Sequence, residues 1–173
     1  MIHKLVEDYI SGKPVPFDDK MSYYVPFLDQ LREQKARPEV PIALNEKWEP
    51  VEWDDPNRWW RGILDCVVDF DDHAIIYDWK TGKEYPDHRE QREIYAAAYH
   101  AIKPVSQVRV FHTYLDTRQN TYTVFYAEEM EDLRKRWEGR VAPMLEDTTF
   151  VPNPGFHCRY CQFSRSVGGP CQF

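Results

Sequence analysis

The sequence lacks any apolar run long enough to cross a lipid bilayer, and it shows no signal peptide, repeat or low-complexity tract. Basic residues are also few, since 22 lysines and arginines stand against 29 aspartates and glutamates, for a net charge of −7. The first absence leads us to expect a soluble, cytoplasmic protein without a membrane partner. The second argues against a passive coat on nucleic acid, because phosphate contacts normally require a surplus of positive side chains.

Length and composition are those of one compact globular protein, with 173 residues, 42% hydrophobic and 29% charged. We expect one domain over residues 1–149, with a cysteine-rich segment, residues 150–173, packed on it. Hydrophobic periodicity and turn residues predict helices over 2–10, 22–35, 87–101 and 128–137, and strands over 40–48, 60–70, 73–79, 107–115 and 121–126. A helical crossover between strands implies an α/β (α+β) fold, a mixed sheet flanked by helices.

Two acidic residues stand on neighbouring predicted strands within residues 61–80. If Asp71 and Asp72 form a two-residue hairpin turn, counting outward along the strands places Asp65 opposite Asp78. Directly opposed side chains lie about 4.5–5.5 Å apart, so the two carboxylates would repel each other unless a cation lies between them. The hairpin therefore predicts a cation site.

A lysine joins these acids on the same face of the sheet. Side chains alternate along a strand, so Lys80 shares a face with Asp78, whereas Trp79 and Cys66 point to the other face. Carboxylate oxygens with few soft ligands favour Mg²⁺ or Mn²⁺ over zinc. Two acids, a divalent cation and an ammonium are suited to phosphodiester cleavage. The alternative is a solvated hairpin whose acids are ordinary surface charges.

Four short motifs follow one another along the chain. They are His3 with Glu7, Gly62-Ile63-Leu64-Asp65, Asp78-Trp79-Lys80, and Gln91 with Tyr95. The set resembles the H-x-x-x-E, G-x-x-D, (D/E)-x-K and Q-x-x-x-Y motifs of the PD-(D/E)XK nuclease superfamily, in particular of its RecB-like branch, which includes Cas4-like proteins and many phage exonucleases. This resemblance implies a restriction-endonuclease-like core with αβββαβ order and a metal-dependent nuclease.

The resemblance also implies roles for individual residues. His3, Asp65, Asp78 and the carbonyl oxygen of Trp79 would bind Mg²⁺ or Mn²⁺, and Lys80 would orient the attacking water. Without the resemblance, a histidine this close to the chain start is more typical of a surface residue.

Gln91 and Tyr95 are four residues apart and therefore lie on one face of the predicted helix. Both could position a DNA strand or the catalytic lysine, while the alternative for Tyr95 is a place in the hydrophobic core. Glu46, expected in the first strand, is either an acid that orients a metal-bound water or pairs with Lys80, or a solvent-facing strand residue.

Further basic side chains could form a local strip for DNA. The candidates are Lys80, Lys83, Arg89, Arg92 and the run Arg134-Lys135-Arg136, of which the run is better explained as a solvated helix face.

Three of the four cysteines fall in the last residues of the chain. Cys158, Cys161 and Cys171 stand there with His157 adjoining, and disulfides are not expected inside a cell. In Cas4-like nucleases a similar C-x-x-C and final cysteine join an upstream cysteine around a [4Fe–4S] cluster. This sequence departs from that pattern, because Cys66 is its only other cysteine. We therefore expect a structural zinc on the three cysteines and a histidine, His157. An iron–sulfur cluster with a non-cysteine ligand and a tail with idle thiols are the alternatives.

Three functions stay open at this point. The first is a metal-dependent DNA exonuclease acting on single strands or duplex ends, in phage or bacterial recombination, replication or DNA degradation. The second is a sequence- or structure-specific endonuclease of the same superfamily. The third is a DNA-binding adaptor without catalysis, which has no evident need to gather Asp65, Asp78 and Lys80.

Overall fold

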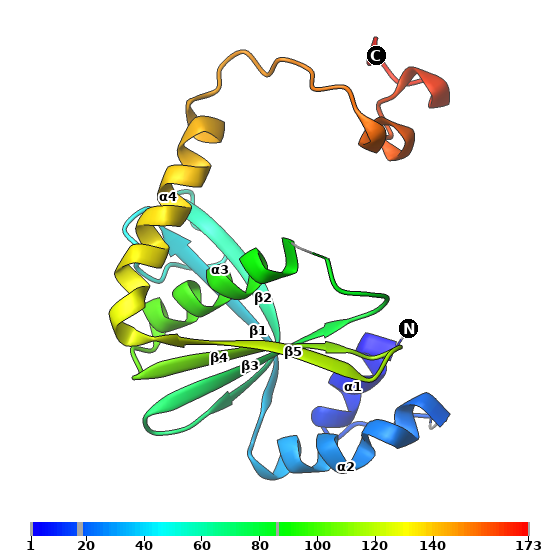
Figure 1. Ribbon diagram of the computed structural model, residues 1–173, viewed down its shortest axis with the longest axis vertical. Helices are drawn as coiled ribbons and strands as arrows, with labels where there is room; N and C mark the ends of the chain where they lie inside the picture. Colours follow the sequence, from blue (N-terminus) through cyan, green and yellow to red (C-terminus); the bar gives the residue numbers. More distant parts are fainter. Residues whose placement is uncertain (1, 17–18, 86, 173) are drawn as a thin grey trace. The chain divides into compact units, whose positions relative to one another are not determined.

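A five-stranded mixed sheet forms the core of the computed structural model, which describes residues 2–16, 19–85 and 87–172 (Figure 1). In spatial order the strands are β1 (Arg37–Asn45), β2 (Arg58–Asp69), β3 (His73–Lys80), β4 (Gln107–Tyr114) and β5 (Gln119–Tyr126). Neighbouring strands are antiparallel except β3 and β4, which are parallel and connected by helix α3 (Asp87–Ile102). The predicted α/β (α+β) class, a mixed sheet with a helical crossover, is confirmed.

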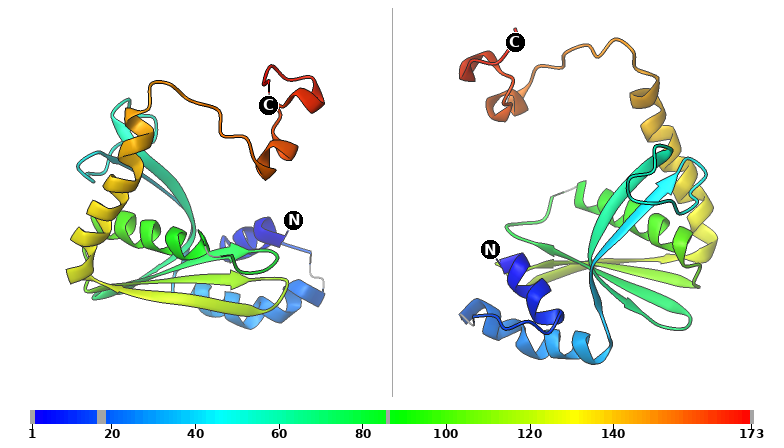
Figure 2. Two further views of the ribbon diagram at one scale, coloured as in Figure 1. Left: turned by 45° about the horizontal axis from the view of Figure 1, so that its top comes forward. Right: turned by 180° about the vertical axis from the view of Figure 1, so that it is seen from behind.

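Helices cover both faces of the sheet (Figure 2). Helix α3 and the beginning of α4 (Met130–Glu146) pack on one face, where the small side chains of Ala96, Ala97 and Ala98 let α3 approach the strands closely. Helices α1 (Ile2–Ile10) and α2 (Asp19–Glu33) pack on the other face. The sheet therefore has two separate hydrophobic cores, and successive residues of β3 alternate between them, with Ile76 in one and Tyr77 in the other.

The structure differs from the predicted boundaries mainly in β1 and α4. Strand β1 begins at Arg37, three residues before the predicted start of the strand at residue 40, and it includes Pro38 and Pro41. Proline is compatible with this strand because β1 lies at the edge of the sheet, where half of its N–H groups need no partner strand. Helix α4 continues to Glu146, well beyond the predicted end at residue 137, and it includes Pro143.

The chain divides into two compact units, Met1–Trp137 and Glu138–Phe173. The second unit contains two short 3₁₀ helices, η2 (Phe156–Tyr160) and η3 (Arg165–Val167). The packing of residues 150–173 on the first unit stays a prediction. In the ranges that the structure describes, no helix is both long enough and apolar enough to cross a bilayer.

Candidate active site

The hairpin between β2 and β3 has the predicted turn and register. Asp71 and Asp72 form a two-residue turn closed by a hydrogen bond from the Phe70 N–H to the His73 carbonyl oxygen, at 2.9 Å. From there the ladder runs outward pair by pair to Cys66 and Tyr77 and ends one pair before the two acids.

The two strands separate at those acids. In a continued ladder Asp65 would lie opposite Asp78, and the N–H of Trp79 would donate to the Leu64 carbonyl. Instead the Trp79 N–H donates to Asp65 Oδ2, at 2.7 Å, and the earlier residues of β2 pair with β1 alone. The Asp65 side chain thus replaces a backbone acceptor at the point where the sheet opens.

A closed ring of polar contacts surrounds Asp78, whose side chain is 4% exposed. The Lys80 ammonium lies 2.6 Å from Asp78 Oδ2 and donates to Gln91 Oε1 at 2.7 Å. Gln91 Nε2 donates to the Tyr95 hydroxyl oxygen at 2.8 Å, and that hydroxyl donates to Asp78. The structure therefore brings Asp78, Lys80, Gln91 and Tyr95 together. Tyr95 also packs against the hydrophobic core, so its two predicted roles coexist.

Both acids are held in surroundings that disfavour their charge. Burial, followed by the negative charge of Asp78, raises the pKa of Asp65 from 3.8 to about 6. Burial also raises the pKa of Asp78, although the nearby Lys80 ammonium opposes this rise. A buried carboxylate and a partly buried one, with one ammonium beside the first, have an excess of negative charge. Their hard oxygen donors, together with the Trp79 carbonyl, fit Mg²⁺ or Mn²⁺.

Helix α1 brings His3 toward these acids. His3 is among the smaller influences that lower the pKa of Asp65, after the Trp79 N–H. The helix is held by Val6 and Ile10, which pack in the same core as Trp79. Yet in the described part of the chain, no three side chains of His, Cys, Asp or Glu converge closely enough to form a metal site as they stand.

Comparison with known proteins identifies the family. The model of the PD-(D/E)XK nuclease superfamily matches residues 5–166. The chain belongs to this superfamily. The match includes the G-x-x-D, D-x-K and Q-x-x-x-Y segments and begins just after His3. Membership implies a nuclease with a nucleic-acid substrate, and nucleases of this superfamily typically use Mg²⁺ or Mn²⁺.

Among solved structures, a crystal structure of SSO0001 is similar over 100% of this chain and 98% of that chain, with 14% sequence identity and a TM-score of 0.41. No curated protein matches the chain significantly.

One acid beside the centre of this PD-(D/E)XK nuclease was not predicted. Glu39 continues the β1–β2 register opposite Asp65, and its backbone has a φ of 50°, a strained left-handed value for a residue other than glycine. Partial desolvation and then the charges of Asp65 and Glu7 raise the pKa of Glu39, while Lys4 and then His3 oppose this rise. Glu39 could not be recognised in the sequence because Pro38 conceals the beginning of the edge strand β1.

Glu46, by contrast, does not lie in the predicted strand. It occupies the exposed turn after β1, next to Asn45, which pairs with Arg58. Strand β2 rises about 3.3 Å per residue, so the seven residues from Arg58 to Asp65 place Glu46 about 20 Å from the acids. Strand β1 ends one residue before Glu46, so the position of this exposed residue favours the solvent-facing alternative, and a role toward a metal-bound water or Lys80 stays a prediction that this position does not support.

The glycine of the G-x-x-D motif has a steric role. A Cβ atom on Gly62 would lie 2.7 Å from Cη2 of Trp60, whose ring folds back over the strand. The motif thus provides room for an aromatic side chain on the same strand as Asp65.

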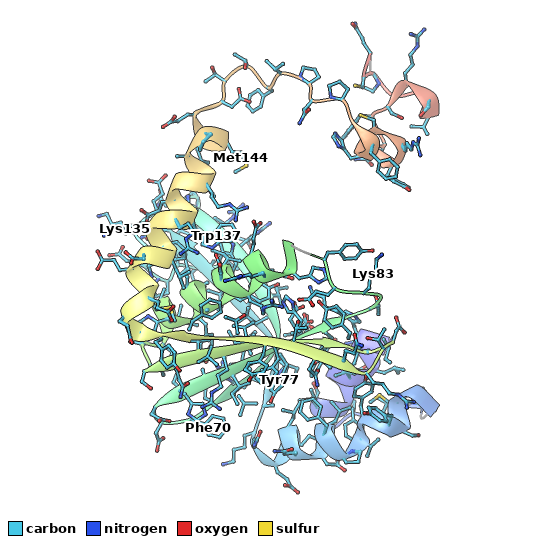
Figure 3. All side chains as sticks on the ribbon, viewed as in Figure 1. Phe70, Tyr77, Lys83, Lys135, Trp137 and Met144 are labelled. Carbon is cyan, nitrogen blue, oxygen red and sulfur yellow. The ribbon has the colours of Figure 1, made fainter. Side chains whose placement is uncertain are left out.

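The predicted basic strip is only partly available to a substrate. Arg92 is 6% exposed and takes part in an internal network, and Arg136 pairs with Glu93 at 3.1 Å. Lys83, which Figure 3 labels, lies exposed in the loop between β3 and α3, with its ammonium over the ring of Tyr85. Arg89, on the first turn of α3, lines a hollow with Tyr85.

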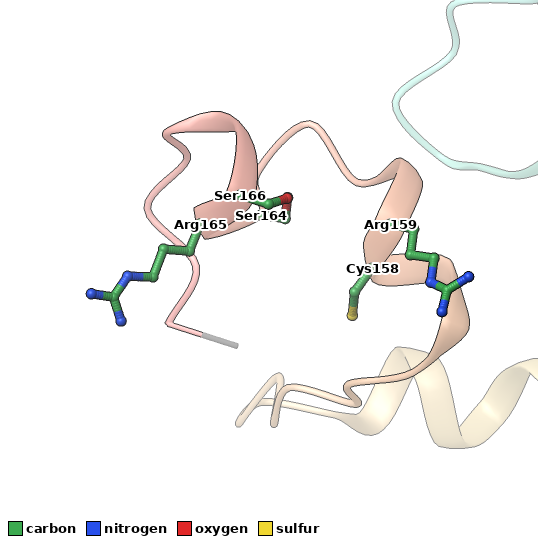
Figure 4. Close-up of a pocket in the computed structure, with 5 residues that line it drawn as sticks. All are labelled: Cys158, Arg159, Ser164, Arg165 and Ser166. Atoms are coloured by element: carbon green, nitrogen blue, oxygen red, sulfur yellow. The ribbon is translucent and has the colours of Figure 1, made fainter.

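The C-terminal cysteines occupy two successive turns of the second unit. The Gly155 N–H donates to Cys158 Sγ at 3.3 Å, and the Cys161 N–H closes the C-x-x-C turn onto the Cys158 carbonyl oxygen. The chain then turns back so that the Cys171 N–H donates to the Phe163 carbonyl oxygen, at 2.9 Å. Cys158 also lines a hollow with Arg159, Ser164, Arg165 and Ser166 (Figure 4).

Two further side chains, those of His157 and Cys66, are possible ligands of the predicted structural metal. His157 Nε2 lies 2.9 Å from the Asn153 carbonyl oxygen, so this nitrogen is already used within its own loop. Cys66 is fully buried, and burial raises the pKa of its thiol to about 12, which keeps it protonated and inert.

Proposed function

We propose that this PD-(D/E)XK nuclease is a RecB-like, Cas4-like DNA exonuclease that hydrolyses phosphodiester bonds with Mg²⁺ or Mn²⁺. The ring formed by Asp78, Lys80, Gln91 and Tyr95, next to Asp65, is the observation that carries this proposal. Such a ring fixes an ammonium beside the buried Asp78 and the partly buried Asp65 before any substrate arrives, and catalysis of a reaction that develops charge requires this preorganisation.

Asp65, Asp78, the Trp79 carbonyl oxygen and His3 would hold the metal. When bound, a divalent cation activates water near neutral pH and neutralises charge on the phosphate. Lys80 is the positively charged donor of the centre, since Gln91 accepts one of its three N–H bonds, Asp78 lies beside a second, and the third is left for the attacking water or a nonbridging phosphate oxygen. Asp65 keeps the Trp79 carbonyl oriented through its hydrogen bond to the same residue's N–H.

The choice of an exonuclease is supported by two features of the chain. The Q-x-x-x-Y contact with Lys80 and the C-terminal cysteines both resemble RecB-like exonucleases of phage and bacterial DNA recombination, replication or degradation. An endonuclease of the same superfamily is the second candidate. Linear, circular and single-stranded DNA, each with Mn²⁺ or with EDTA, separate these activities. Cutting of closed circles at one site would refute the exonuclease.

A structural metal on Cys158, Cys161 and Cys171 belongs to the same proposal. The N–H···S bond at Cys158 and the tight C-x-x-C turn favour metal-binding thiolates, whereas the engaged Nε2 of His157 argues against that histidine as the fourth ligand unless it uses Nδ1. Zinc is expected, with a [4Fe–4S] cluster as the alternative. Elemental analysis and the visible spectrum of protein purified without oxygen distinguish the two metals.

Substitution of the catalytic lysine tests the proposed reaction. Lys80→Ala should lower the cleavage rate by about 10²–10³, the usual effect of losing a preorganised donor, and leave folding intact. Lys47→Ala is the matched control, because this lysine lies in the exposed turn after β1, outside the centre and the predicted basic strip, and its backbone N–H makes its described contact, to Asn45 Oδ1 at 2.9 Å. Equal cleavage rates for the two variants would reject the assigned centre.

A further inference from the structure

A row of polar residues crosses the sheet at the level of the proposed centre. Asp78 on β3 is the register partner of His112 on β4, and His112 is the partner of Thr121 on β5. Register partners share a face, so His112 points to the same side of the sheet as Asp78. Its predecessors on that face of β4 are Val108 and Val110, both fully buried.

His112 is fully buried and only partly satisfied. Its Nε2 atom lies 3.8 Å from Asp78 Oδ2 and has no hydrogen-bond partner among the residues that the structure describes. A buried polar atom without a partner is unfavourable, and a third valine would fit the pattern of this strand. The position of His112 beside Asp78 therefore calls for a reason other than packing.

The hydrogen bond on the opposite side of the imidazole determines which ring nitrogen of His112 carries the proton. Arg92 Nη1 lies 3.1 Å from His112 Nδ1, and a guanidinium can only donate, so Nδ1 accepts and Nε2 carries the hydrogen. Arg92 is itself anchored by Thr121 Oγ1 at 3.0 Å and Thr123 Oγ1 at 3.1 Å. His112 thus presents a neutral N–H group on the side of Asp78.

A second histidine supports the orientation of this ring. His88 on α3 meets the His112 ring edge-on, with 5.5 Å between the ring centres, and His88 Nδ1 is held by the Tyr114 hydroxyl at 2.8 Å. The imidazole of His112 is therefore enclosed by Arg92, His88 and the sheet, and its Nε2 side is the one that faces the acid.

We propose that His112 is a positioning residue for Asp78, and this inference rests on the proposed metal-dependent nuclease function. The Lys80 ammonium lies 2.6 Å from Asp78 Oδ2, on the oxygen that also faces His112. When Lys80 turns to the phosphate or the attacking water, the Nε2–H of His112 becomes the donor that holds Asp78 in its metal-binding orientation. A neutral donor suits this task, because a second cation would compete with the metal for the carboxylate.

The proposal predicts a specific pattern of Mn²⁺ affinities, measured by titration calorimetry on the complete protein without DNA. His112→Leu keeps a similar volume but removes the donor, and it should weaken Mn²⁺ binding about 10- to 100-fold, as loss of a hydrogen bond to a metal ligand usually does. His112→Gln places an amide N–H near the former Nε2 and should restore most of the affinity. His112→Asn can contact Arg92 but is too short to reach Asp78, so it should bind as weakly as the leucine variant.

Controls separate this inference from the function on which it rests. His100, in the last turn of α3, is partly buried and also contacts an arginine, Arg134 of α4. His100→Leu should bind Mn²⁺ like the wild type. If the leucine variant unfolds, the glutamine and asparagine variants still decide. Equal affinity for these two, or wild-type affinity in all three, would overturn the role of His112. Failure of the wild type itself to bind Mn²⁺ would instead refute the proposed function.

Discussion

Asp65 should make the metal-free protein less stable at neutral pH, and Asp65→Asn should therefore stabilise it while abolishing cleavage. The asparagine Oδ1 can still accept the Trp79 N–H, so the hydrogen bond at the opening of the sheet is retained. What the substitution removes is a buried negative charge next to that of Asp78. The expected gain in stability is thus the energetic cost of the metal site when no metal fills it.

The magnitude follows from the pKa of Asp65. The group titrates near 3.8 when unfolded and at about 6 when folded, so the folded state binds the proton more tightly. Stability therefore falls as pH rises from about 4 to about 6, and the loss is complete above that range. At about 1.36 kcal/mol for each pKa unit the loss is about 3 kcal/mol at most. For a chain of this length, a gain of about 1–3 kcal/mol should raise Tm by about 3–9 °C.

Thermal unfolding in EDTA at about pH 7.5 and about pH 4 measures this effect. The variant should melt above the wild type at the higher pH and together with it at the lower pH. Mn²⁺ should raise the Tm of the wild type but not of the variant.

Asp69→Asn is the control of opposite sign. Although burial opposes it, contacts with Lys103, Tyr99 and Arg37 lower the pKa of Asp69, so this substitution should destabilise the protein at neutral pH. If Asp65→Asn gives no stabilisation at about pH 7.5, or the same stabilisation at both pH values, the reasoning about the buried acids is refuted.

Two further substitutions test the surroundings of the centre. Glu39→Gln removes the charge of the exposed acid opposite Asp65. In calorimetric titration this substitution should weaken Mn²⁺ binding by about 2- to 10-fold, because one outer carboxylate is lost. An unchanged affinity would place Glu39 outside the site. Gly62→Ala should lower the free energy of unfolding, measured by urea denaturation, by about 1–3 kcal/mol, because the new Cβ would displace the Trp60 ring. A variant as stable as the wild type would show that this ring moves freely.

Short-range rules were enough to predict much of the centre. Alternation along a strand, a two-residue turn and counting outward gave the correct β2–β3 register, and helical spacing put Gln91 and Tyr95 on one face. Each of these inferences depends on residues near in sequence, whose geometry the backbone limits to a few possibilities. The order of the four motifs added the superfamily, which the comparison confirmed.

Features that depend on distant partners could not be obtained in this way. The sequence does not reveal that β2 separates from β3 at Asp65. The Trp79 N–H could donate either to the Leu64 carbonyl oxygen or to Asp65 Oδ2, and only the packing of the strands decides between these acceptors. It misplaced Glu46 and overlooked Glu39, since both depend on where an edge strand with two prolines begins and ends.

The sequence by itself therefore determined the fold class, the acidic pair, its lysine and the helix that contacts them. Only the tertiary structure decided which third acid lies beside Asp65 and that a buried histidine from β4 faces Asp78. The physical reason is that a row across a sheet joins residues from strands far apart in sequence. Their proximity follows from strand order and register together, and no local pattern contains both.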